Sequence, residues 1–172
     1  EPTFVFGHIT IPHPPYIFDR NCNPQKNLGE VSSWWSDKMK LFYLEELICA
    51  NKQILDLVEF INKKDPNSII VIQSDTGSHW DYETEAIFSS IPLSEWTTRD
   101  LEENFANLTA FKIPKKYQNR LYPSISQVNA FRLIFSIIED RESFFLPDYS
   151  YATHYEFHPG FGKVHKYDRQ NR

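Results

Sequence analysis

An apolar run at residues 69–72, Ile-Ile-Val-Ile, most constrains how this chain can fold. Consecutive β-branched apolar residues favour a strand, and the lack of polar alternation predicts that both of its faces are buried, as in a parallel sheet. The chain turns polar directly afterwards, at Asp75 and Thr76. Gly77 then interrupts the pattern before His79. Because open α/β sheets bind ligands at the ends of their strands, we predict a functional edge at Asp75, Thr76 and His79.

A long helix is predicted before this strand, over about residues 36–64. Six apolar residues at helical spacing predict its buried face: Leu44, Leu47, Ile48, Leu55, Val58 and Ile61. A first strand is predicted at residues 3–9. A strand–helix–strand unit of this size has parallel strands and a right-handed crossover. We therefore expect His8 and His13, which end or follow the first strand, to lie at the same sheet edge as Asp75.

The rest of the chain adds helices and strands to this unit. The pattern predicts a short helix at 98–104, a strand at 108–113, a loop at 115–124, a helix capped by Ser126, and an edge strand or hairpin arm at 149–157. The buried face of the last helix is predicted to hold Val128, Phe131, Ile134, Phe135 and Ile138. The predicted fold class is α/β, with a mostly parallel sheet flanked by helices in an α/β/α sandwich. We expect one domain over 1–159 and a flexible basic tail over 160–172.

Composition narrows the classes of function. The chain has 172 residues, 41% hydrophobic and 16% aromatic, which is enough for one domain with its own core. A net charge of -5 gives no electrostatic reason to expect nucleic acid as a partner. No apolar run reaches the roughly 18–20 residues that a bilayer requires, so no membrane segment is predicted in this chain. Cys22 and Cys49 could form a disulfide, but two unpaired thiols are the expected state.

The tripeptide Asp75-Thr76-Gly77 also resembles the Asp-Thr-Gly of aspartic proteases, in which two aspartates share one proton. A single copy would require a dimer. Those folds are nearly all-β, whereas a helix of about seven turns is predicted before this motif. No second apolar segment ending in Gly and no Gly-rich flap follow it. A dimeric aspartic protease is therefore the less favoured interpretation.

Several segments, in this order, resemble the C-terminal half of sulfatase-like proteins of the alkaline phosphatase superfamily. They are 4–8 (FVFGH), 12–15 (PHPP), 50–52 (ANK) within the long helix, 70–75 (IVIQSD), 107–111 (NLTAF), 122–126 (YPSIS) and 128–132 (VNAFR). The superfamily includes arylsulfatases and lipid phosphoethanolamine or phosphoglycerol transferases. The resemblance covers most of residues 3–150 and implies part of an alkaline-phosphatase-like fold.

The resemblance implies a metal-dependent hydrolase or transferase acting on sulfate or phosphate esters. It assigns His13 to contact with the substrate anion, with His8 as a further candidate. It assigns Asp75 as a ligand of a divalent metal ion, which could be zinc, calcium, magnesium or manganese. The family has Asp-His-Gly where this chain has Thr76 in the middle position, so a neutral hydroxyl replaces a strong nitrogen donor. Thr76 and His79 are weak candidate ligands.

The family's nucleophile lies in the half that precedes the segments matched here. Because the chain opens at Glu1 without a methionine, we expect the rest of a longer parent protein upstream. The isolated chain is therefore expected to be inactive. Its expected partners are an anionic ester and the remainder of the parent, and the resemblance suggests an extracytoplasmic domain of a membrane-anchored protein. The alternative is a non-catalytic anion-binding or interaction domain.

Overall fold

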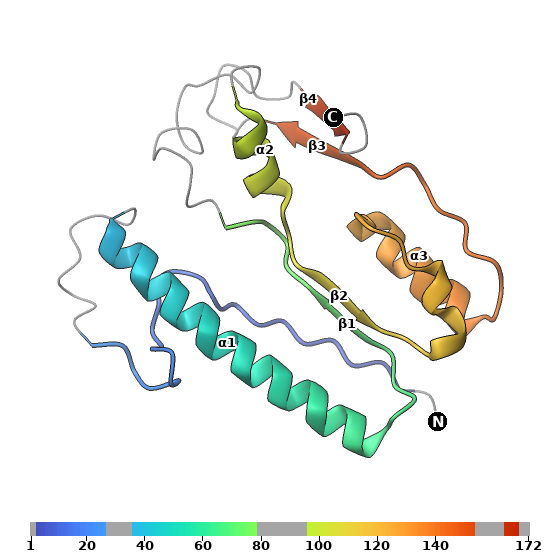
Figure 1. The fold of residues 1–172 in the computed structure, drawn as a ribbon, viewed down its shortest axis with the longest axis horizontal. Helices are drawn as coiled ribbons and strands as arrows, with labels where there is room; N and C mark the ends of the chain where they lie inside the picture. The colour runs from blue at the N-terminus through green and yellow to red at the C-terminus, as the bar shows by residue number, and fades with distance from the viewer. Residues whose placement is uncertain (1–2, 27–35, 79–95, 154–163, 169–172) are drawn as a thin grey trace. The chain divides into compact units, whose positions relative to one another are not determined.

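The computed structural model divides the chain into two compact units, Glu1–Lys64 and Asp65–Arg172, whose elements are drawn in Figure 1. It describes residues 3–26, 36–78, 96–153 and 164–168. Helices are combined with short antiparallel strand pairs, so the fold is of the mixed α/β class. Within the described residues, no helix is both long enough and apolar enough to cross a membrane.

The first unit is built on one long helix, α1, which spans Asp37–Lys64 and confirms the predicted helix. Residues 3–15 precede it without regular secondary structure. The strand predicted at 3–9 is therefore not formed in the described part of this unit. Phe4, Val5 and Phe6 are largely exposed there.

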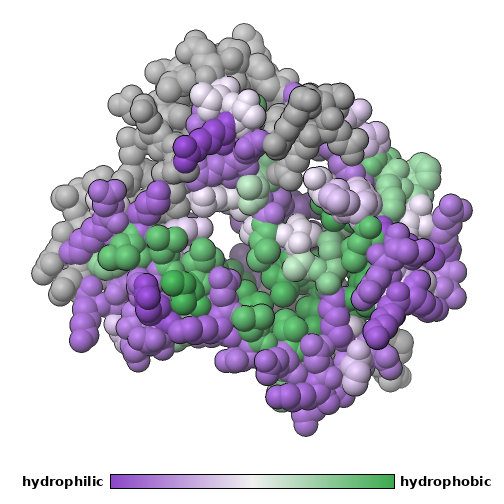
Figure 2. Space-filling view, in the orientation of Figure 1, coloured by the Kyte–Doolittle hydropathy of each residue, from purple (hydrophilic) through white to green (hydrophobic). Residues whose placement is uncertain are grey.

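The buried stripe of α1 differs from the predicted one. Its buried residues are Met39, Phe42, Glu46, Cys49 and Ala50. By contrast, Leu44 is 44% exposed and Leu55 is 63% exposed, and Figure 2 shows apolar side chains at the surface over α1. The predicted face was wrong because residues 16–26 are attached to the neighbouring stripe, by contacts that helical periodicity does not encode.

The second unit contains the two strands predicted in its N-terminal part. β1 (Ile70–Gln73) pairs with β2 (Thr109–Lys112) in an antiparallel ladder that sets Val71 opposite Phe111. β1 is half-buried along its length, so the expectation that both faces are buried is not met. The pairing partner is also antiparallel, where a parallel neighbour was expected.

Three helical segments accompany the β1–β2 pair in the second unit. α2 (Thr98–Phe105) confirms the short helix, and Thr97 with Asp100 forms a capping box at its start. A 3-10 helix, η3 (Lys115–Arg120), occupies the region predicted as loop. α3 (Gln127–Ile138) confirms the last predicted helix, although the Ser126 side chain makes no capping hydrogen bond.

The core of the second unit lies where α3 and η3 meet the strand pair. Its buried residues are Ile113, Tyr117, Leu133, Ile134 and Ile137. Of the face predicted for α3, Ile134 is buried, whereas Val128, Phe131, Phe135 and Ile138 are exposed. The prediction was wrong for these four residues because α3 is apolar around most of its circumference, so periodicity alone does not select one face.

The C-terminal part of the second unit is a strand pair. β3 (Tyr149–Thr153) confirms the predicted hairpin arm and pairs antiparallel with β4 (Val164–Asp168). Five residues of the segment predicted as a flexible tail, 160–172, therefore form β4.

Adjacent isoleucines at the end of α3 test this core. Ile137 is 5% exposed and Ile138 is 66% exposed. Truncating a buried isoleucine removes apolar contacts and leaves a cavity, so Ile137→Ala should lower the free energy of unfolding by about 2–5 kcal/mol. Ile138→Ala, the matched control, should change it by less than about 1 kcal/mol. Urea unfolding measures both, and equal losses would contradict the described face of α3.

Candidate functional site

The acid and hydroxyl predicted as a functional edge lie directly after β1. Asp75 and Thr76 are both exposed. The Asp75 carboxylate accepts a hydrogen bond from the backbone N–H of Thr76, with Oδ1 and N 3.0 Å apart. Because Asp75 is exposed, water can solvate its charge, and burial does not by itself demand a counter-charge. Although the sequence predicts a strand buried on both faces, the acid that follows it is exposed and needs no partner to offset burial.

Ser74 fixes the backbone on which Asp75 is carried. Its carbonyl accepts hydrogen bonds from Gln127 Nε2 at 2.6 Å and from Asn107 Nδ2 at 3.4 Å. Its hydroxyl oxygen lies 2.7 Å from the donating backbone nitrogen of Leu108, and the same hydroxyl donates to the carbonyl of Thr76 at 3.0 Å. The end of β1 is thus held by the first residue of α3 and by the residues that enter β2.

Oxygen donors dominate this strand end. The carboxylate of Asp75 and the hydroxyl of Thr76 are hard ligands, which suit magnesium, calcium or manganese. No group of three or more His, Cys, Asp or Glu side chains that could hold a metal ion occurs in the described part of the chain. His79, the further candidate ligand, lies outside the described residues.

The two candidate histidines belong to the first unit, and both are exposed. His13 lies between the cis peptide bonds Ile11–Pro12 and Pro14–Pro15. Its ring Nδ1 is 2.7 Å from the carbonyl oxygen of Pro14, and a carbonyl can only accept, so Nδ1 carries the proton. Nε2 is therefore the nitrogen left to contact a ligand.

A buried carboxylate anchors the chain just beyond His13. Glu46 on α1 is fully buried, and its Oε1 accepts hydrogen bonds from the backbone nitrogens of Ile17 at 2.8 Å and Phe18 at 3.3 Å. Burial raises the pKa of Glu46, although these two N–H groups and the nearby His13 act in the opposite direction. Glu46 was not among the residues predicted from the sequence. Its one signal was an acid three residues before Cys49, among the apolar residues of the helix.

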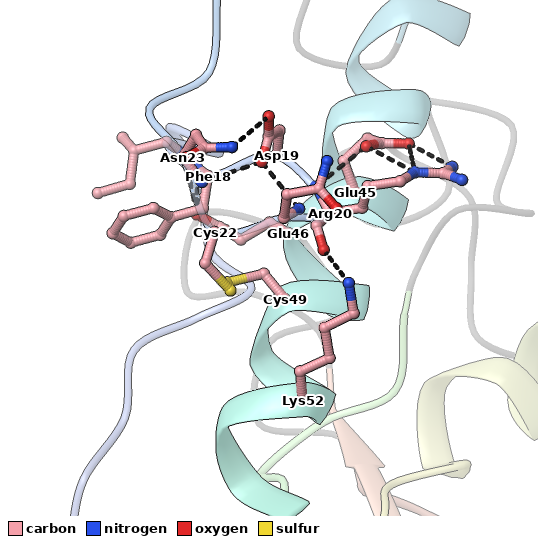
Figure 3. The surroundings of a disulfide bond; sticks show 11 residues. Phe18, Asp19, Arg20, Cys22, Asn23, Glu45, Glu46, Cys49 and Lys52 are labelled. Carbon is pink, nitrogen blue, oxygen red and sulfur yellow. Dashed lines mark hydrogen bonds and ion pairs between the residues drawn. A yellow bond between two sulfur atoms is a disulfide. The ribbon is translucent and has the colours of Figure 1, made fainter. Parts of the chain in front are cut away.

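A disulfide joins the same loop to the same helix. Cys22 and Cys49 are bonded, with their Cα atoms 5.2 Å apart, and Figure 3 shows the bond next to Glu46. The expectation of two unpaired thiols was wrong. Asp19 accepts hydrogen bonds from the backbone nitrogens of Asn21 and Asn23, and this turn brings Cys22 to the helix. Local spacing could not reveal the pairing, because the cysteines are 27 residues apart.

Charged side chains extend the attachment toward the surface (Figure 3). The guanidinium of Arg20 donates to both carboxylate oxygens of Glu45, and its backbone N–H also donates to Glu45. Lys52 Nζ donates to the carbonyl of Arg20 at 2.6 Å. Water screens an exposed ion pair of this kind, so it contributes little to stability, and the disulfide and Glu46 carry most of the attachment.

A second buried polar residue organises the start of α3. Asn129 is fully buried, and its side-chain amide forms hydrogen bonds with both backbone and side-chain groups. Nδ2 donates to the carbonyl of Leu146 at 2.7 Å and to Asp148 Oδ1 at 2.8 Å, while Oδ1 accepts from the backbone N–H of Leu146. Asp148 also accepts from the backbone N–H of Ser126 and from the Tyr122 hydroxyl, each at 2.8 Å.

Burial and hydrogen bonding shift the titration of this network. Burial works to raise the pKa of Asp148, but the hydrogen bonds from Ser126, Tyr122 and Asn129 outweigh it, so the pKa lies below its ordinary value. Burial, reinforced by Asp148, raises the pKa of Tyr122 to about 12. Of these residues, Tyr122 and Asn129 were indicated beforehand only as parts of the resemblance, in the segments 122–126 and 128–132.

The structure brings together the candidates that are neighbours in sequence. Asp75 and Thr76 share the end of β1 in the second unit, whereas His8 and His13 belong to the first. No family model, curated protein or solved structure matches this chain.

The Cys22–Cys49 disulfide can be tested by counting free thiols and by measuring the free energy of unfolding without it. The chain has two cysteines, so titration of the unfolded, unreduced protein should find no free thiol. Replacing both (Cys22→Ser with Cys49→Ser) should lower the free energy of unfolding by about 2–4 kcal/mol, because the unfolded chain is no longer constrained. The reduced wild-type protein, which serves as the control, should match the double variant. Two titratable thiols before reduction would contradict the bond.

The lowered pKa of Asp148 predicts acid sensitivity. A group whose folded pKa is depressed contributes stability above its unfolded pKa, near 3.9, and loses it as the pH falls through the folded value. Urea unfolding at pH 7 and at pH 3 should therefore show a smaller acid loss in Asp148→Asn than in the wild-type protein. Asp56→Asn, at an exposed position on α1, is the control. Identical acid losses in wild type and Asp148→Asn would refute the role of this carboxylate.

Proposed function

We propose that this chain is part of a sulfatase-like, metal-dependent hydrolase or transferase that acts on sulfate or phosphate esters. The observation that carries the proposal is the placement of Asp75. It is exposed directly after β1, on a backbone that Ser74 fixes through four hydrogen-bonding contacts. An exposed acid on a rigid strand end is what a metal ligand in an open α/β sheet requires.

The proposed roles follow from the chemistry of each side chain. Asp75 supplies a carboxylate ligand, and Thr76 and His79 are weaker candidates. A divalent cation held there would neutralise the anionic ester and lower the pKa of a nucleophile. His13 contacts the anion through Nε2, because Nδ1 is engaged with Pro14. A protonated imidazole donates to an oxyanion and stabilises negative charge as it develops.

The proposal includes a mostly parallel sheet between layers of helices, in which residues 3–9 are one strand. Two observations support it. Phe4, Val5 and Phe6 form an apolar segment that is largely exposed in the first unit. The stripe of α1 that contains Leu44 and Leu55 is also exposed. A strand buried in a sheet, with α1 packed against it, would remove both surfaces from water.

The chain alone is proposed to be inactive. Cys22 and Cys49 form a disulfide, so neither thiol is available as a nucleophile. Thr76 stands in a ligand position of the family's motif, and no other residue of this chain is assigned as nucleophile by the resemblance. The second candidate function, a non-catalytic anion-binding or interaction domain, is favoured by His13, whose exposed imidazole has Nδ1 on the Pro14 carbonyl and leaves Nε2 to contact an anion.

Metal titration tests the role of Asp75. Isothermal titration of the chain with magnesium, calcium, manganese and zinc should detect a divalent site whose affinity falls at least about tenfold in Asp75→Ala, since a lost charge-assisted ligand costs 1.4 kcal/mol or more. Asp56→Ala, another exposed aspartate, should leave the affinity unchanged. Equal binding by wild type and Asp75→Ala would contradict the metal site and favour the non-catalytic domain.

Turnover tests the proposed inactivity of the isolated chain. Purified protein supplied with each metal should hydrolyse neither p-nitrophenyl sulfate nor p-nitrophenyl phosphate above the rate in buffer, because no nucleophile is assigned within it. The Asp75→Ala protein is the matched control for contaminating activity. Turnover that requires Asp75 would contradict the inactivity, while strengthening the assignment of Asp75.

A further inference from the structure

We propose that Glu46 is the positioning residue for His13, holding the segment 13–18 on α1 so that the imidazole is presented to a sulfate or phosphate group. The inference rests on the proposed function, which gives His13 the contact with the anion. It adds a residue that the resemblance does not assign. All of the residues concerned belong to the first unit.

The anchor itself is a fully buried carboxylate that bonds consecutive backbone N–H groups. Glu46 Oε1 accepts from Ile17 at 2.8 Å and from Phe18 at 3.3 Å. Its other oxygen, Oε2, is buried without a hydrogen-bond partner among the described residues. A buried charge is costly unless its hydrogen bonds are specific. The carboxylate is therefore committed to fixing the chain at residues 17 and 18.

Tyr16 reinforces this anchor on the side nearer His13. It is 5% exposed, and its ring packs edge-on against Tyr43 of α1, with centroids 5.7 Å apart. Burial raises the pKa of Tyr16 to about 12, and the charges of Tyr43 and Glu46 act in the same direction. Residues 16–18 are thus held to the helix by a buried ring and by two backbone hydrogen bonds.

The link from the anchor to His13 is stiff. Only Pro14 and Pro15 separate His13 from Tyr16, and each proline ring fixes its own φ. The hydrogen bond from His13 Nδ1 to the Pro14 carbonyl then sets the orientation of the imidazole. A displacement at residues 16–18 is therefore transmitted to the imidazole, instead of being absorbed by a flexible spacer.

The disulfide makes the proposal testable without unfolding the segment. Cys22–Cys49 attaches the same loop to α1 one turn beyond Glu46. Glu46→Met fills a similar volume with a helix-forming side chain but accepts no hydrogen bond from Ile17 or Phe18. Glu46→Gln keeps a carbonyl oxygen that can accept both bonds, and its amide nitrogen replaces the unpartnered Oε2. Glu45→Gln, at the adjacent position, removes the charge that pairs with Arg20.

The experiment follows the ¹⁵N resonances of the His13 ring while the whole chain is titrated with sodium sulfate and then with sodium phosphate. Either anion should perturb Nε2 in the wild-type protein. Glu46→Met should weaken this binding at least about tenfold and shift the Nδ1 resonance, since the loss of hydrogen bonds to a charged group releases the segment. Glu46→Gln should restore binding to within about threefold, and Glu45→Gln should match wild type.

The possible outcomes separate the inference from the proposed function. Unchanged affinity and unchanged Nδ1 resonance in Glu46→Met would overturn the positioning role and leave the anion contact of His13 intact. A wild-type His13 that responds to neither anion would overturn the anion contact and, with it, this inference. If Glu46→Met does not fold, Glu46→Ser takes its place with the same expected results. The serine side chain is too short for its hydroxyl to accept the hydrogen bond from the backbone N–H of Ile17. Failure of Glu46→Gln to restore binding would also contradict anchoring through hydrogen bonds.

Discussion

The attachment of residues 16–26 to α1 is the constraint on which the first unit depends. A single amphipathic helix gains most of its stability from packing, and α1 packs against this loop through Glu46 and Cys49. These two residues are three positions apart, so they lie on the same side of the helix. The loop therefore selects which stripe of α1 is buried, and it leaves the stripe with Leu44 and Leu55 at the surface. It also fixes the chain that leads back to His13.

A comparable role belongs to Asn129 in the second unit. Its amide donates a hydrogen bond to Asp148, and Asp148 in turn accepts one from the backbone N–H of Ser126, just before α3. The next residue of the helix, Gln127, donates to the carbonyl of Ser74. These hydrogen bonds, joined through the backbone link from Ser126 to Gln127, thus connect a buried amide to the end of β1. Apolar packing around Leu133 holds α3 against the strands, while these polar contacts set its position along them.

Local patterns predicted most elements of this chain but missed η3 and β4, placed a strand at 3–9 that is not formed, and predicted burial poorly. Helical periodicity and β-branched runs identified α1, α3, β1 and β2, because these signals depend on near neighbours in sequence. The buried faces predicted for α1 and α3 were wrong. Each helix has more than one apolar stripe, and long-range contacts determine which of them is buried. The Cys22–Cys49 bond and the Glu46 anchor join residues 27 or more positions apart, and no local rule specifies such a pair. Asp75 and Thr76 were placed correctly after a strand, but the antiparallel partner of that strand was not foreseen.

The buried polar residues are themselves an argument about function. A carboxylate or an amide in a protein interior contributes less to stability than well-packed apolar atoms of the same volume, and it specifies one arrangement of the chain more strictly. Glu46 and Asn129 are both fully buried. Glu46 fixes the backbone at Ile17 and Phe18, two and three residues beyond Pro15. The hydrogen bonds of Asn129 lead to the backbone that carries Asp75. A fold under pressure for stability alone would favour apolar residues at both positions. The segments that these two side chains hold are therefore restricted to one conformation, which is what the anion contact proposed for His13 and the metal ligand proposed for Asp75 would require.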